Sequence, residues 1–139
     1  MNMHDLANHI IAVANENHRT ITNIQLQKVL YFTLRYSIPL IGLENTKEIY
    51  DEPFLVWRYG PILKSQYDRF YTYGASPIIE DLPQSEKYKR LNKLIIRLLD
   101  MDVFRLINAS RTHNFWKQNK IAEGRSTIAY PLNEVLRKN

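Results

Sequence analysis

The sequence predicts a mainly α-helical protein that folds as one compact domain over residues 1–139, with about six helices and at most a two-stranded β element. The chain has 139 residues, a common size for one globular domain. Hydrophobic residues make up 45% and charged residues 24%, as is typical of folded proteins. Apolar residues recur at helical spacing over most of the chain, whereas strand-like patterns are short and few.

The first two helices are predicted from periodicity and capping signals. A first apolar face ends at the polar run 15–18, so this helix covers about residues 4–17. Its apolar residues are Leu6, Ile10, Val13 and Ala14. Thr22 stands three residues before Gln25, a capping-box spacing that begins a second helix, which stops near Pro39. One face of this helix carries Leu26, Val29, Leu30, Thr33 and Ser37.

A strand and a third helix are expected next. Residues 54–57 are apolar, aromatic and β-branched and are bounded by prolines and glycine, which indicates a short strand. Gly60 then turns the chain, and Pro61 suits the first position of a helix. That helix ends at Gly74, a residue that favours helix termination. Its inward residues are Leu63, Tyr67 and Phe70.

The remaining elements follow a proline-containing connector at residues 75–85. A fourth helix is marked by Tyr88, Leu91, Leu94, Ile95 and Leu98. Asp102 is the expected N-cap of a fifth helix over residues 104–110. Residues 112–125 are expected to be irregular, and residues 126–129 have the composition of a second short strand. Pro131 opens a last helix to Leu136.

Composition restricts the function classes. The chain has no cysteine, which excludes disulfides, thiolate nucleophiles and iron–sulfur clusters and fits a cytoplasmic protein. The N-terminal segment lacks a basic region, and no apolar run is long enough to span a membrane, so no membrane association is expected. The net charge is +5, with the whole basic excess after residue 70. Such an excess is compatible with an acidic partner or with nucleic acid, but also with an ordinary solvated surface.

No cofactor or metal site is expected. The four glycines are too scattered for a phosphate-binding loop. His4, His9 and His18 are five and nine residues apart, which does not place them together on a helix as metal ligands.

A hydrolase is the weakest functional hypothesis. Ser110 and His113 lie three residues apart, with Asp100 or Asp102 as a third member. Because no nucleophile elbow or oxyanion loop accompanies them, capped helix ends explain these residues better, and we expect a protein that is not an enzyme.

Two polar helix faces are candidate partner-binding surfaces. On the second helix, Gln27, Lys28, Tyr31 and Arg35 share the side opposite Leu26, so a tyrosine lies within a polar stripe. The alternative is that Tyr31 is covered by another helix. On the fourth helix, one face carries Lys89, Arg90, Lys93 and Arg97. This face suits phosphates or an acidic partner, or it is simply solvated.

Several motifs together resemble a known family. Residues 24–32 (Ile-Gln-Leu-Gln-Lys-Val-Leu-Tyr-Phe), residues 56–62 (Val-Trp-Arg-Tyr-Gly-Pro-Ile), and then Tyr67 and Phe70 are similar in order and spacing to the SocA-like antitoxin domain, also called the Panacea domain. The strongest match covers residues 22–74, and a weaker one follows in Thr-His-Asn-Phe-Trp at 112–116. The scaffold residues implied are Leu26, Leu30, Phe32, Trp57, Tyr59, Gly60, Pro61, Tyr67 and Phe70.

This resemblance implies an antitoxin-like, non-enzymatic protein of bacteria or phages that neutralises a cognate toxin by direct binding. Host protease machinery is a further partner that the resemblance admits. The alternative is a DNA-binding regulator of a phage or mobile element, with the first two helices as a helix-turn-helix and the basic fourth helix on phosphates. Specific nucleic-acid binding is not expected, because Lys28 is the only basic residue near the start of the second helix.

Overall fold

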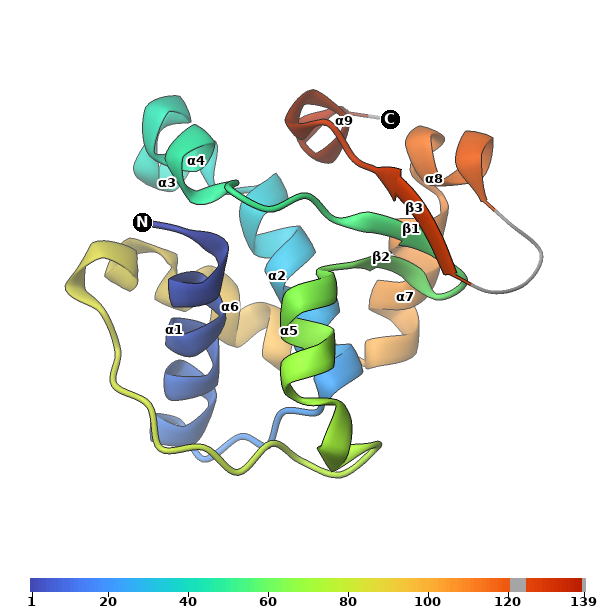
Figure 1. Cartoon of the computed structure of the whole chain (residues 1–139). Helices are drawn as coiled ribbons and strands as arrows, with labels where there is room; N and C mark the ends of the chain where they lie inside the picture. Colours follow the sequence, from blue (N-terminus) through green and yellow to red (C-terminus); the bar gives the residue numbers. More distant parts are fainter. Residues whose placement is uncertain (121–124, 139) are drawn as a thin grey trace.

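The computed structural model describes residues 1–120 and 125–138 and confirms a mainly α-helical protein. In this part of the chain, nine α-helices accompany one three-stranded antiparallel sheet (Figure 1). The expected number of helices was lower because α3 (Ile38–Ile41), α4 (Leu43–Ile49) and α8 (Asn114–Asn119) are too short to show helical periodicity.

The second helix, α2 (Asn23–Arg35), lies at the centre of the molecule, with α1 (Met3–Glu16) and α7 (Val103–Arg111) on opposite sides in Figure 1. The predicted capping box is present: Thr22 accepts from the Gln25 amide, and the Gln25 side chain accepts from the Thr22 amide. Every residue from position 26 to position 34 of α2 is buried. This helix therefore has almost no free face.

The sheet has the strand order β2-β1-β3, formed by β1 (Leu55–Trp57), β2 (Gly60–Ile62) and β3 (Arg125–Ala129). The expectation that Pro61 begins a helix is wrong, because Pro61 lies in β2 opposite Val56. A two-residue turn joins β1 to β2, and the positive φ of Gly60, the first residue of β2, makes this turn possible. Because β2 is an edge strand, it tolerates a proline. Both predicted strands are present, and β2 is the additional one.

Helix α5 (Lys64–Arg69) and a 3-10 turn (Tyr71–Tyr73) follow, ending at Gly74, which has the expected positive φ. The connector then passes below the lower ends of α1 and α2 in Figure 1. The Ile78 amide donates to Ile21 O at 2.8 Å, which attaches the connector to the segment between these helices. The end of the connector contacts α1, where the Ser85 amide donates a hydrogen bond to His9 Nδ1.

The predicted fourth helix is present as a 3-10 segment (Glu86–Leu91) continued by α6 (Asn92–Leu99). Asp102 caps α7 as predicted, and α9 (Leu132–Leu136) follows Pro131. Buried apolar side chains from all parts of the described chain form one continuous core. Among the described residues, no helix is both long and apolar enough to cross a membrane.

Candidate functional site

The polar stripe predicted on α2 is not on the surface. The side chains of Gln27, Lys28 and Tyr31 are fully buried, so the expectation of an exposed recognition face there is wrong. The reason is that α2 is enclosed by α1, α5, α6, α7, α9 and β2. Arg35, at the C-terminal end, is half-buried, and its Nη1 donates to Val135 O at 2.8 Å.

Two of these buried residues hold the β1–β2 hairpin against α2. Gln27 Oε1 accepts from the Leu63 amide at 2.8 Å, and Lys28 Nζ donates to Pro61 O at 2.7 Å. Loss of hydration on burial lowers the pKa of Lys28 to about 7. The polar motif residues thus satisfy one backbone group of β2 and one directly after it, 33 and 36 residues later in the sequence.

The segment at 112–116 belongs to the same cluster. Tyr31 Oη lies 2.7 Å from His113 Nδ1, and burial raises the pKa of Tyr31 to about 12, so the phenol keeps its proton. Burial and the neighbouring positive charge of Arg35 lower the pKa of His113 to about 4, so its neutral ring can accept that hydrogen bond. Trp116 Nε1 donates to Trp57 O at 2.8 Å. All four residues of these two hydrogen bonds lie in the segments that carry the family resemblance, at 24–32, 56–62 and 112–116.

The expected scaffold residues are buried with two exceptions. Tyr67 is half-buried, and Tyr59 is 52% exposed because it lies in the hairpin turn. The buried members are Leu26, Leu30, Phe32, Trp57, Gly60, Pro61 and Phe70.

The structure gives the hypothetical hydrolase residues separate partners. Ser110 Oγ donates to Ile107 O at 2.7 Å, and His113 pairs with Tyr31. Asp102 caps α7, and Asp100 forms an ion pair with Arg19. These side chains are not assembled into a triad.

A groove of about 720 Å³ lies beside the basic face of α6. Its apolar lining comes from α2, α3, α6, α7 and the segment after α6, and it comprises Phe32, Pro39, Leu40, Leu94, Leu98, Met101, Leu106 and Ala109. The cations Arg90, Lys93 and Arg97 border it, and all three are exposed. We call this feature the basic-rimmed groove. Lys89, predicted with this face, is not part of the lining and pairs with Glu86 at 2.5 Å.

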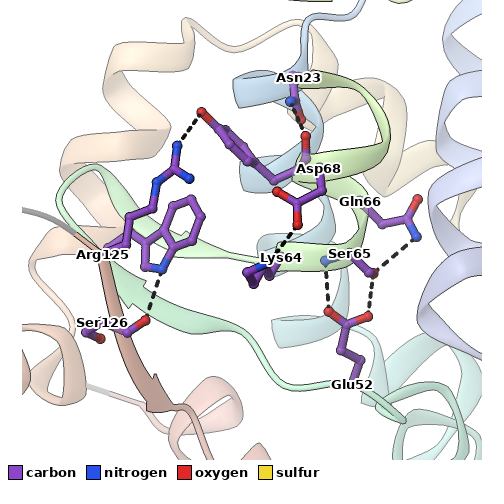
Figure 2. A network of polar contacts seen from close by, with 10 residues as sticks. Asn23, Glu52, Lys64, Ser65, Gln66, Asp68, Arg125 and Ser126 are labelled. Carbon is purple, nitrogen blue, oxygen red and sulfur yellow. Dashed lines mark hydrogen bonds and ion pairs between the residues drawn. The ribbon is translucent and has the colours of Figure 1, made fainter. Parts of the chain in front are cut away.

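A second cavity, of about 850 Å³, lies between the β1–β2 hairpin, α5 and the start of α2. Its aromatic lining is Trp57, Tyr59, Tyr67 and Tyr71, and its cations are Arg58 and Arg125. We call it the aromatic–arginine cleft. The Arg125 guanidinium carbon lies 4.6 Å from the centroid of the Trp57 ring, and Arg58 lies over Tyr59 at 5.4 Å. Figure 2 shows Arg125 reaching from β3 towards α5, where Nη2 contacts Tyr67 Oη at 3.5 Å.

Two acidic residues on or bonded to α5 have partners outside the cleft lining. Figure 2 shows Glu52 accepting from both the amide and the hydroxyl of Ser65 at the start of α5. Asp68 pairs with Lys64 at 2.7 Å. None of the described residues that line either cavity is acidic.

No group of three or more histidine, aspartate or glutamate side chains among the described residues could hold a metal ion. Comparison of the chain with models of protein families, with curated proteins and with solved structures found no match.

Proposed function

We propose that this protein is an antitoxin-like binding protein that neutralises a cognate toxin by direct contact through the basic-rimmed groove. The observation that carries the proposal is the combination, in that groove, of an apolar lining with a row of cations along one edge. The resemblance to the SocA-like antitoxin domain is consistent with this function.

The spacing of the cations indicates what the groove would bind. Lys93 and Arg97 are four residues apart on α6, and Arg90 precedes Lys93 by three, so the charges follow one edge of the helix. An amphipathic helix of the toxin could place apolar side chains at a spacing of three and four on Phe32, Leu94 and similar residues. Acidic residues on its flank would face the cations. The expected partner element is therefore an acidic amphipathic helix.

The burial of α2 favours protein binding over the alternative of a helix-turn-helix regulator. A recognition helix must place several side chains in the major groove of DNA. Gln27 and Lys28, which would be among them, are enclosed within the protein.

The experiment compares two charge-reversed variants with equal net charge. Lys93→Glu with Arg97→Glu alters the groove, and Lys87→Glu with Lys117→Glu alters exposed cations outside its lining. The toxin is first obtained by capture from the native host with the wild-type protein, or as a growth-arresting product of the adjacent reading frame. The groove variant should lose both rescue of growth and toxin binding, and the control variant should keep both.

Both variants should melt within a few degrees of wild type, since the substituted side chains are exposed. A folded groove variant that binds and rescues like wild type would refute the groove as the toxin-binding surface.

A further inference from the structure

The aromatic–arginine cleft is independent of the basic-rimmed groove, because the two share no lining residue. We propose that this cleft binds a nucleotide unit, an aromatic base joined to a phosphate, either as a free nucleotide or within a single strand.

The exposed tyrosines of the cleft indicate a planar ligand. Tyr59 and Tyr71 are 52% and 60% exposed, although large aromatic side chains are usually buried. Both line the same cavity as Trp57 and Tyr67. Stacking on exposed aromatic rings is a common way to hold an unpaired base.

The charge of the cleft indicates an anion. Arg58 and Arg125 line it, and in the described part of the chain neither forms an ion pair with a carboxylate. Glu52 and Asp68 are already held by Ser65 and Lys64. Arginine guanidinium groups match phosphate oxygens in geometry as well as in charge.

The cleft is also ordered before any ligand binds. The Arg125 guanidinium lies over both the Trp57 ring and the Tyr67 ring, at 4.6 and 5.3 Å from their centroids, so two side chains hold it in place. Trp57 Nε1 donates to Ser126 O at 3.1 Å, which ties β1 to β3 at this point (Figure 2). A preorganised site loses less conformational entropy on binding.

The volume and the lining of the cleft favour a nucleotide unit over duplex DNA and over an acidic peptide. A volume of about 850 Å³ is in the range of small-molecule and cofactor sites. Duplex DNA would not use the exposed rings, because its bases are already stacked and paired. An acidic peptide would satisfy the arginines but would leave the tyrosine faces without planar partners.

The test titrates the full-length protein with five probes: AMP, inorganic phosphate, an oligothymidylate of about ten nucleotides, a duplex of equal length and a glutamate-rich peptide. Quenching of tryptophan fluorescence and calorimetry report binding. We expect binding of AMP, of the oligonucleotide or of both. AMP alone would identify a free nucleotide as the ligand, and the oligonucleotide alone would identify a single strand.

Two variants and a control locate the site. Tyr59→Ala with Tyr71→Ala should weaken binding at least about tenfold, because two stacking faces are lost. Arg58→Gln should weaken binding of the oligonucleotide and reduce its dependence on salt. Tyr36→Ala removes a tyrosine of similar exposure outside the cleft and should leave the affinity unchanged. All these side chains are exposed, so circular dichroism should show folded proteins.

Three results would overturn the proposal. The first is the absence of binding of both AMP and the oligonucleotide at millimolar concentration. The second is equal affinity in the double tyrosine variant and wild type. The third is binding of phosphate, the duplex or the acidic peptide as tight as that of AMP and the oligonucleotide, which would indicate charge attraction without recognition of a base.

Discussion

Lys28 Nζ donates to Pro61 O at 2.7 Å, and this contact joins the central helix to the edge strand of the sheet across 33 residues of sequence. The lysine is fully buried, and loss of hydration lowers its pKa to about 7. Lysine is usually an exposed cation, but Lys28 lies in the interior. Its pKa therefore differs between the folded and the unfolded protein.

Lys28 should make the stability of the protein depend on pH above neutrality. Its pKa in the folded state lies below the ordinary value of 10.5, so between about pH 7 and pH 10 the unfolded chain binds more protons than the folded one. The free energy of unfolding contributed by this group should therefore rise with pH over that range. Urea unfolding at several pH values would measure the slope.

The matched variant for this measurement is Lys28→Met, which keeps an unbranched chain but cannot titrate. The wild type should gain stability relative to Lys28→Met as pH rises from about 7 to 10. A constant difference between the two proteins over this range would show that Lys28 titrates normally in the folded state.

His113 should produce a pH dependence on the acidic side. Burial and the charge of Arg35 lower its pKa to about 4, from an ordinary value of 6.5. As pH falls from about 6.5 to 4, the unfolded chain takes up a proton that the folded chain excludes, so stability is lost. His113→Asn retains an acceptor for the Tyr31 hydroxyl and should lose less stability over this interval. A pKa near 6.5 for His113 in the folded protein, measured by NMR, would contradict this prediction.

Local signals in the sequence were sufficient to locate several helices. The capping box of Thr22 and Gln25 and the N-cap Asp102 depend on residues close in the chain, and both are present. The hairpin could not be predicted in the same way. At Pro61 a helix start and an edge strand are both locally allowed, and the contact with Lys28 on α2 favours the strand.

The candidate sites were predictable only in part. The cations of the basic-rimmed groove follow from the pattern of Lys93 and Arg97 on one helix, but its apolar lining is contributed by segments distant in sequence. The burial of Gln27 and Lys28 was not predictable from spacing. Their partners are backbone groups of Leu63 and Pro61, and backbone groups carry no residue-specific signal.

Trp57 and Tyr59, two motif residues separated by one position, should differ sharply in their effect on stability. Trp57 is 7% exposed, whereas Tyr59 is 52% exposed. Trp57→Ala should cost about 3 to 5 kcal/mol, because a large buried ring is removed. Tyr59→Ala should cost less than about 1 kcal/mol. Denaturant unfolding of both variants gives the comparison, and similar losses would show that the two side chains are equally important for folding.

The described glycines all have positive φ, and among them Gly60 should lose the most stability on substitution by alanine. A Cβ at this position would lie 2.3 Å from Ser110 Oγ and 3.3 Å from Lys28 Nζ, in addition to the strain of φ +98. Ser110 cannot move away easily, because it is buried and its hydroxyl donates to Ile107 O. Gly60→Ala should therefore cost about 3 kcal/mol or more.

Gly42 is the matched control for that substitution, since its φ is +85 and a Cβ there would have no atom within 4 Å. Gly42→Ala should show backbone strain alone, about 1 to 3 kcal/mol. Adding Ser110→Ala to Gly60→Ala removes the clashing hydroxyl, so the double variant should be more stable than the sum of the single losses predicts. Equal losses for Gly60→Ala and Gly42→Ala, with additive effects at position 110, would show that the close approach to Ser110 has no energetic consequence.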